Sequence, residues 1–476
     1  MKIARWTLFI FIIGGSVSSQ AYSIETQSIQ DKINKTIHLA DETARDNHSE
    51  LIGELPPLST NQTSKYTFTL DDCINFALRN NNNIKIAKKN IVKQNAIQKV
   101  ALSQLLPSLT LNTSATKIDD EMLKKISGTN GRVTENLWDA DATINQTLFA
   151  GGKNLALLQK ENLMLDSLKK KLKWIVEDTI FNIKTIFYSA LLARNRIEVQ
   201  EQLVELLSKE LISEKNKFKA GVVPEFNVLR AEVALANSKV PLIRAQNSYR
   251  ITIEELRQVL GLSDIETESQ ILLDIKGELK DKPYNINLDK ALEIAQSNRA
   301  ELEELYAAIA AQDKVILANR AGYLPKINIF ASYGLANKNL SHTFYDDAAA
   351  GWKVGALASW NLFDGFGTTA QVEQAIADKN ILKTNKSNQQ LTIEVEVRRA
   401  YSSFVEAKAL LEASTKVTEQ AEESLRLAKA SKDAGVGIQL DVLQSQYDLT
   451  DACNNKISAL YDYNVAIARL ERAVGK

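Results

Sequence analysis

Two stretches of the sequence, residues 153–219 and 368–433, contain neither glycine nor proline. An α-helix rises about 1.5 Å per residue, so each stretch predicts a helix about 100 Å long. Apolar residues recur in both stretches at heptad-like spacing: Val397, Tyr401, Phe404, Leu411 and Leu425, and their counterparts Ile183, Phe187, Ala190, Ile197 and Leu211. Because such a stripe must be buried, we expect both helices to pack laterally on other helices as coiled coils.

The sequence contains one structural unit twice. At an offset of about 218 residues, Leu106-Pro107 recurs as Leu324-Pro325, and at about 214 residues Ala220-Gly221-Val222 recurs as Ala434-Gly435-Val436. The offset changes between residues 117 and 134, which indicates one loop that differs in length by about four residues. We therefore expect a first repeat over residues 67–261, a linker over 262–287 with a possible short strand at 271–275, and a second repeat over 288–476.

Each repeat opens with a helix and then changes to strands. Residues 71–105 and 289–321 lack a helix breaker, carry Asp71 and Asp289 in the first turn, and are followed by Pro107 and Pro325. After each proline, apolar and polar residues alternate, which predicts strands at about 107–117, 134–149, 325–336 and 351–363. Each repeat is then helix, strand, strand, long helix, turn and helix.

The predicted strands fit a membrane barrel better than a soluble sheet. Strands of about ten residues, tilted by about 40°, would span the apolar band of an outer-membrane barrel. Aromatic residues at both ends agree with two interfacial belts: Trp138, Trp352, Trp360, Phe149 and Phe363. A soluble sandwich with one wet face is the less favoured alternative, because four strands cannot close a barrel and would leave exposed edges.

The N-terminus predicts export from the cytoplasm. Lys2 and Arg5 precede an apolar stretch over residues 6–15, and small residues lead up to Ala21, so residues 1–21 read as a signal peptide. An uncleaved anchor helix is the alternative, but the apolar stretch is too short to span a bilayer comfortably. Residues 22–66 form a polar extension outside the repeat.

Composition excludes several classes of protein. The 58 basic residues balance 58 acidic residues, so the chain lacks the positive charge expected of a nucleic-acid-binding protein. Three histidines and two cysteines form no cluster with metal-ligand spacing, and the sequence does not indicate whether Cys73 and Cys453 pair. No nucleophile stands at a recognisable spacing from a base, so we expect no enzyme, no cofactor and no metal.

The order of these elements resembles the TolC family of outer-membrane efflux proteins. The resemblance rests on Leu-Pro before each hairpin, on Leu148-Phe149-Ala150-Gly151-Gly152 and Leu362-Phe363-Asp364-Gly365 after it, and on the turns at Gly221 and Gly435. It implies a mainly α-helical homotrimer in the outer membrane of a Gram-negative bacterium. Three chains would each give four strands to one 12-stranded β-barrel in outer-membrane lipid, and the helices would continue it as a periplasmic α-helical barrel.

The same resemblance gives the helical turns a role. It implies that the turns meet a periplasmic adaptor protein of an inner-membrane transporter, with contact residues Gly221, Val222, Val223, Gly435, Val436 and Ile438. Any helix–turn–helix needs glycine at its corner, so the turn alone explains the two glycines and no binding partner is needed for that. The neighbouring apolar side chains favour a partner, because exposed apolar groups mark interaction sites.

The resemblance also implies a gate at the periplasmic end. Asp441 matches a position where family members place a ring of carboxylates, which would favour cations; an acidic residue that stabilises a helix N-terminus explains it equally well. Gln444 and Asn227 occupy two further gate positions and carry no charge. Lys432 and Gly437 stand where some members form salt bridges between repeats, so we expect a weakly latched gate.

The leading hypothesis is a passive exit duct of a tripartite efflux pump or a type I secretion system, opened by adaptor docking. A non-conducting envelope scaffold or adhesin built from long helices is the main alternative, and a soluble periplasmic coiled coil is a weaker one.

Overall fold

A computed structural model describes residues 65–117, 119, 136–262, 272–281, 283–337 and 349–475, all within one compact unit, Ser64–Lys476. The predicted signal peptide, the predicted extension up to residue 64 and the tips of both hairpins lie outside the described residues. In the part of the chain that the structure describes, no helix is long and apolar enough to cross a membrane.

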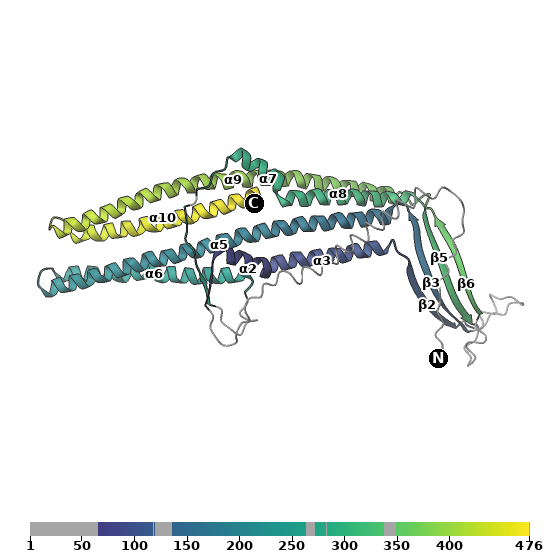
Figure 1. Ribbon diagram of the computed structural model, residues 1–476, viewed down its shortest axis with the longest axis horizontal. Coiled ribbons are helices and arrows are strands. Elements are labelled where there is room, and N and C mark those ends of the chain that lie inside the picture. Colours follow the sequence, from purple (N-terminus) through teal and green to yellow (C-terminus); the bar gives the residue numbers. More distant parts are fainter. Residues whose placement is uncertain are drawn as a thin grey trace. The chain divides into compact units, whose positions relative to one another are not determined.

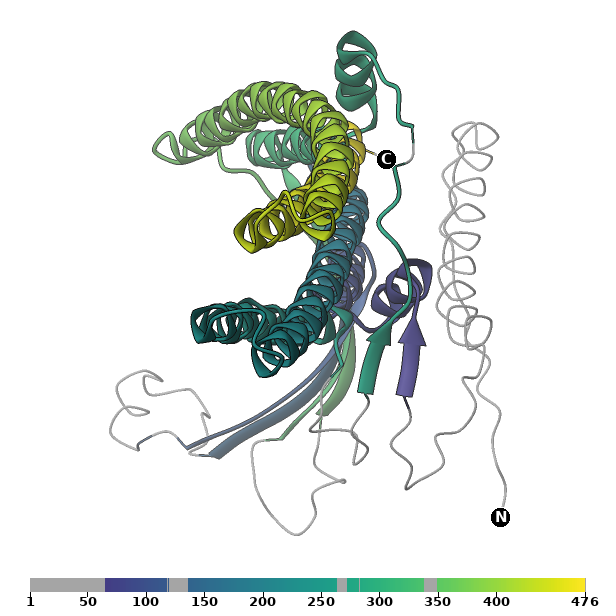
Figure 2. The same ribbon diagram turned by 90° about the vertical axis from the view of Figure 1, so that its left-hand side faces the viewer.

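Two helices of 67 residues, α5 (Lys153–Lys219) and α9 (Gly367–Asp433), dominate the fold, which confirms the predicted long helices (Figure 1). Each turns back into a 36-residue helix, α6 (Glu225–Leu260) after α5 and α10 (Gln439–Val474) after α9. The α6 helix continues through Pro241. Because α10 also packs on α5, the two helix pairs lie side by side (Figure 2).

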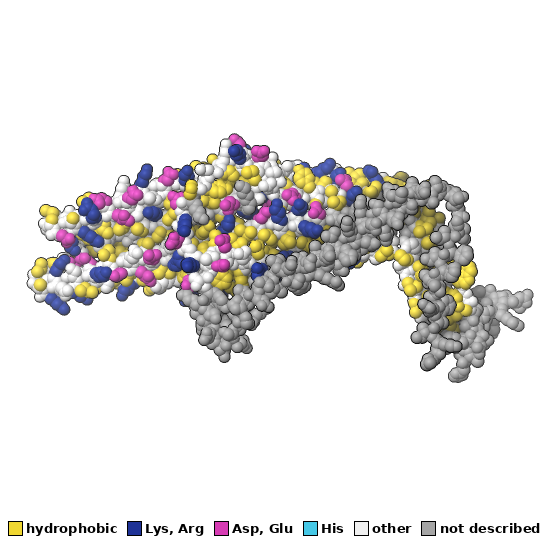
Figure 3. All heavy atoms as spheres, in the orientation of Figure 1, with side chains coloured by type: hydrophobic (Ala, Val, Ile, Leu, Met, Phe, Trp, Pro, Cys, Tyr) yellow, Lys and Arg dark blue, Asp and Glu magenta, His cyan; other side chains and the backbone are white. Residues whose placement is uncertain are grey.

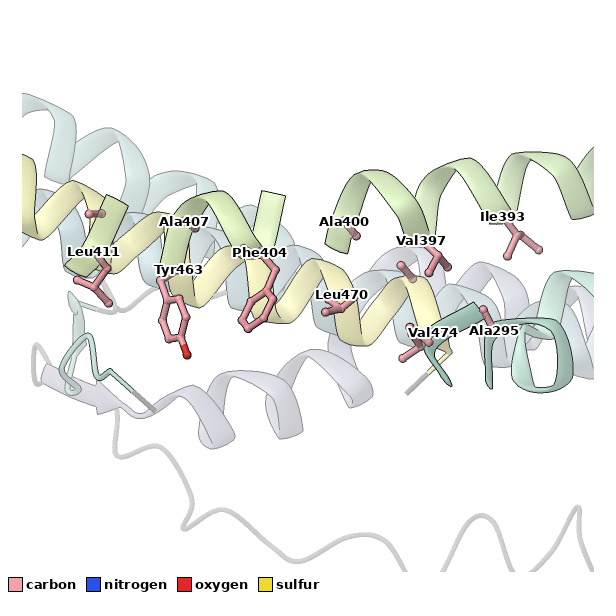
Figure 4. Close-up of a cluster of buried hydrophobic side chains, with 14 of the residues drawn as sticks. Ala295, Ile393, Val397, Ala400, Phe404, Ala407, Leu411, Tyr463, Leu470 and Val474 are labelled. Atoms are coloured by element: carbon pink, nitrogen blue, oxygen red, sulfur yellow. The ribbon is translucent and has the colours of Figure 1, made fainter. Parts of the chain in front are cut away.

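Each helix pair has a hydrophobic core between the middle of its long helix and the end of its return helix, built by heptad spacing. In the second repeat the α9 residues of this core recur every three or four positions, as Ile393, Val397, Ala400, Phe404, Ala407 and Leu411 (Figure 4). They pack against α10 residues such as Tyr463 and Leu470. The first-repeat core joins α5 to α6 and to the helix before the first hairpin, through Ile183, Phe187, Leu256 and Cys73.

The helix that opens each repeat is broken in two, so the predictions of single helices over 71–105 and 289–321 are wrong. The first repeat has α2 (Leu70–Asn80) and α3 (Asn82–Ser103), and the second has α7 (Leu288–Asn298) and α8 (Ala300–Arg320). The breaks, at Asn81 and Arg299, are equivalent positions of the two repeats. Each of these residues donates to a carbonyl in the last turn of the return helix: Asn81 Nδ2 to Val259 at 2.7 Å, and Arg299 Nη1 to Ala473 at 3.2 Å.

Each return helix ends at a glycine, and this glycine lies against the break in the opening helix of the same repeat. Gly261 and Gly475 adopt positive φ angles of 76° and 78°, which favour glycine. A Cβ at Gly261 would lie 2.7 Å from the Asn80 carbonyl oxygen, and one at Gly475 would lie 3.2 Å from that of Asn298. The backbones therefore touch where the first and last helices of a repeat meet.

The strands form two sheets. The larger has the order β2 (Ser108–Lys117), β3 (Asn136–Ala150), β5 (Lys326–Asn337) and β6 (Ala349–Ser359), with all neighbours antiparallel and a bulge in β3 near Leu148. The short helix η2 (Ala321–Tyr323) precedes β5. The smaller sheet pairs β1 (Lys65–Phe68) with β4 (Leu272–Ile275) in parallel. Strand β4 agrees with the short strand predicted at 271–275, whereas β1 was not predicted.

The contact at the break predicts a specific cost for a side chain at Gly261. We expect Gly261→Ala to lower the free energy of unfolding by about 2–4 kcal/mol, through the left-handed backbone and the clash with Asn80. Gly221→Ala is the matched control: its φ is also positive, but open space surrounds it, so it should cost only about 1 kcal/mol. Thermal unfolding followed by circular dichroism compares the two, and equal losses would contradict the contact.

Candidate functional site

The register of the larger sheet places one set of apolar side chains on a single face. Leu111 of β2 pairs with Ala142 of β3, which pairs with Tyr333 of β5, which pairs with Trp352 of β6. The neighbouring rows on the same face contain Leu109, Ile144, Ala331 and Val354, and Ala140 and Leu335. Most of the larger members of this set are exposed in the single chain. Figure 3 shows hydrophobic side chains on the sheet, whereas charged side chains of both signs are scattered over the helices.

The opposite face of the sheet is mainly polar. Side chains from neighbouring strands form hydrogen bonds there: Asn112 donates to Asp141 at 3.3 Å, and Thr147 donates to Asn328 at 2.9 Å. Phe330 is an exception; its ring lies over Gly355, where an added Cβ would come within 2.7 Å of a ring atom. An apolar face and a polar face are what a membrane barrel with a wet lumen requires.

Four of the five predicted interface aromatics are exposed at the ends of the strands. Trp352 lies at the loop end of the sheet; Phe149, Trp360 and Phe363 lie at the helix end. The Trp360 indole donates to the Tyr323 carbonyl at 3.1 Å. Trp138 is only 7% exposed, so it packs within its own chain and does not present its ring to a surrounding surface as predicted.

The turns at the far end of the helices expose apolar side chains. Gly221 and Gly435 adopt positive φ angles of 71° and 79° and end α5 and α9. Beside them, Val222 is 72% exposed and Val436 is 83% exposed; Ile438 is also exposed, and Val223 is half-buried. The structure thus presents the predicted contact residues at the two helical turns.

Near the turns, one carboxylate joins the two repeats. The Glu210 carboxylate of α5 accepts a hydrogen bond from Lys432 Nζ of α9 at 2.8 Å, in an ion pair, and another from Gln439 Nε2 of α10 at 2.6 Å. Lys432 was predicted at the gate, where the resemblance implied only a weak latch. In the structure it pairs with an acid on α5 that the family positions did not indicate. We call Glu210, Lys432 and Gln439 the inter-repeat latch.

The charge state of Glu210 depends on its two partners in the latch. Burial acts to raise the pKa of Glu210, but the hydrogen bond and charge of Lys432, with the bond from Gln439, outweigh it and hold the pKa below its usual value. The carboxylate therefore stays ionised in the folded chain, as the ion pair requires.

The other predicted gate residues lie apart from the latch. Asp441 is exposed in the first turn of α10, with its carboxylate 3.5 Å from the backbone nitrogen of Ile438, so the helix-terminus interpretation stays open. Gln444 donates to Asp448 at 2.8 Å within the same helix. Asn227 lies half-buried near the start of α6. Glu210 and Gln439 were not predicted, because Glu210 and Lys432 lie at different distances from their turns and are not equivalent positions of the two repeats.

Comparison with known sequences identifies the family. The sequence model of the outer membrane efflux protein family matches residues 73–262 and again residues 291–476, which also confirms the duplication. The chain belongs to this family. It is therefore an outer-membrane efflux or secretion channel and not an enzyme, and it extends from the outer membrane into the periplasm.

Individual relatives agree with this assignment. The chain is 24% identical over 305 residues to the alkaline protease secretion protein AprF of Pseudomonas aeruginosa, covering 63% of this chain and 62% of AprF. It is 23% identical over 405 residues to the outer membrane protein TolC of Escherichia coli, covering 83% of this chain and 80% of TolC. The fold matches the crystal structure of the Campylobacter jejuni CmeC outer membrane channel, with a TM-score of 0.74, 17% identity, and 88% and 90% of the two chains covered.

The lowered pKa of Glu210 predicts a pH-dependent latch. The contribution of the Glu210 ion pair to stability should be complete above the pKa of about 4.3 that the carboxyl has in the unfolded chain. It should be lost as the pH falls through the lower pKa of Glu210 in the folded chain. Spin labels at Val222 and Val436, in a Cys453→Ser background, would measure the distance between the two turns. We expect a narrow distance distribution at pH 7 that broadens below about pH 4. In Glu210→Gln it should be broad throughout, and an identical pH response in that variant would contradict the assignment.

Proposed function

We propose that this chain forms a homotrimeric exit duct of a tripartite efflux pump or type I secretion system. The observation that carries the proposal is that the four-stranded sheet is open, with β2 and β6 as edge strands. Within the described residues, β2 pairs only with β3, and β6 only with β5. An exposed sheet edge of this length leaves backbone donors and acceptors unpaired, which a membrane does not tolerate.

Copies of the chain can remove both edges. Because the strands alternate in direction across the sheet, β6 of one chain and β2 of the next would meet antiparallel, so the alternation continues through each joint. Two chains would give an eight-stranded barrel, and side chains fill the interior of a barrel of that size. Three would give 12 strands and room for a lumen, in agreement with the trimer that the family resemblance implies.

The two faces of the sheet support the orientation of such a barrel. The face with Leu111, Ala142, Tyr333 and Trp352 would meet the lipid, and the face with Asn112, Asp141 and Asn328 would line the water-filled lumen. The α5–α6 and α9–α10 pairs would continue the duct through the periplasm. A scaffold or adhesin needs no polar lumen, so this amphipathic sheet favours the channel over that alternative.

Opening would take place at the helical turns. The duct itself is passive, and the inner-membrane transporter supplies the energy. A periplasmic adaptor would bind the exposed apolar residues beside Gly221 and Gly435, and this binding would separate the latch. Because the latch joins α5 to α9 and α10, breaking it would free the two helix pairs to move apart at this end.

Single-channel recording in planar bilayers tests the channel and the latch together. We expect conductance from the purified chain, and an open-to-closed ratio about tenfold higher in Glu210→Gln, which removes one charge-assisted contact. Glu205→Gln is the matched control, because Glu205 pairs with Lys209 on the same helix and should leave gating unchanged. A monomeric product without conductance would instead support the scaffold.

Ion selectivity distinguishes the two interpretations of Asp441. If three copies of Asp441 form a ring at the periplasmic opening, Asp441→Asn should lower the cation-to-anion permeability ratio severalfold, by removing three charges from a narrow passage. Reversal potentials in a salt gradient measure this ratio. An unchanged ratio with a lowered melting temperature would assign Asp441 to the end of α10 alone.

A further inference from the structure

The contact line between α5 and α6 contains a cavity of about 310 Å³ between two hydrophobic clusters. On one side lies the first-repeat core with Phe187 and Leu256, and on the other a small cluster around Leu203 and Leu207. The cavity is lined by Ala193, Arg196, Gln200, Pro241, Arg244, Ala245, Ser248 and Asn454, from α5, α6 and α10. Small and polar residues thus stand where a coiled coil would normally place large apolar ones.

The lining carries positive charge without a matching negative charge. Arg196 and Arg244 are both exposed, and none of the lining residues is acidic. Arg244 forms no hydrogen bond or ion pair with any described residue. Arg196 donates one hydrogen bond, to the Ser458 hydroxyl of α10 at 3.0 Å, and Asp462 is near enough for its charge to interact with Arg196 but not to form an ion pair.

The Gln200 amide belongs to the same lining. The side chain is 8% exposed, lines the cavity, and forms no hydrogen bond with a described residue. Its amide atoms are not among the buried, unpartnered polar atoms of the described residues, so they remain accessible from the cavity. The amide can therefore donate a hydrogen bond to a ligand there.

The second repeat gives an internal comparison. The positions equivalent to Arg196, Gln200 and Arg244 are Leu410, Ser414 and Ser458, none of them charged. The Ser414 hydroxyl is satisfied by the Leu411 carbonyl at 3.1 Å. Leu411 and Tyr463 extend the second-repeat core along this level. The duplicated fold therefore does not require the charges of the first repeat.

We propose that this cavity binds a phosphate group, either inorganic phosphate or a phosphomonoester. The guanidinium groups of Arg196 and Arg244 would neutralise it, and the Gln200 amide would donate a further hydrogen bond. Two guanidiniums on different helices suit a doubly charged tetrahedral anion better than a single carboxylate. Since Arg196 already contacts α10, the bound anion would connect α6 through α5 to the second repeat.

Binding of inorganic phosphate to the purified full-length chain tests this site. Equilibrium dialysis at constant ionic strength, with chloride as the replaced anion, should show saturable binding at one site per chain. We expect Arg244→Gln to weaken it by at least about tenfold, as for the loss of one charge-assisted contact. Arg250→Gln is the matched control, since Arg250 lies on the same helix outside the cavity and bonds to Asn247; it should bind like the original chain.

A second variant separates binding from folding. Gln200→Leu should weaken phosphate binding severalfold while the melting temperature is maintained, because leucine keeps a similar side-chain volume but donates no hydrogen bond to the anion. Competition with acetate tests the ligand class, and acetate should displace phosphate only weakly. Equal binding by Arg244→Gln and the original chain, or equal affinity for acetate and phosphate, would overturn the proposal.

Discussion

The fold of each repeat depends on a contact between its first and last helices. The return helix ends at Gly261 or Gly475, where its final carbonyls have no partner inside the helix. Asn81 or Arg299 supplies a donor from the break of the opening helix, and the glycine lets the two backbones touch. This contact closes the repeat on itself. The 67-residue helix extends beyond this contact in both directions, toward the sheet at one end and toward the helical turn at the other.

The sequence predicted what depends on local pattern and missed what depends on tertiary contact. The long helices follow from the absence of glycine and proline, and the strands from alternation after Pro107 and Pro325. The break at Asn81 contains no glycine or proline; the Asn81 side chain caps α3 by accepting from the backbone nitrogens of Asn83 and Ile84, and it also donates to a helix end distant in sequence. The four residues of β1 are too short to show a period, and their pairing with β4 is non-local. Lys432 was predicted at the gate, but its partner Glu210 lies in the other repeat.

The two repeats share a backbone arrangement but differ in the charges of the residues at the break. At the break of the first repeat, a neutral Asn81 suffices. In the second, buried Arg299 takes that place and pairs with Glu301 at 2.6 Å and with Glu396 at 2.9 Å. Arg472 extends this network to Asp178 of α5 at 3.1 Å. A buried guanidinium is costly unless its donors are satisfied, so Arg299 requires carboxylates that the neutral Asn81 does not.

These differences matter for an assembly of three chains. If the repeats were identical, three chains would present six equal helix pairs, and nothing would distinguish contacts within a chain from contacts between chains. Glu210 is equivalent to Ser424 in the second repeat, so the latch forms from α5 toward α9 and α10 and has no mirror image. The net charge of the chain is zero, and long-range fields are screened within about 10 Å in salt. In the proposed trimer, local pairs placed unequally between the repeats would therefore distinguish the six helix pairs and reduce their arrangement to three-fold symmetry.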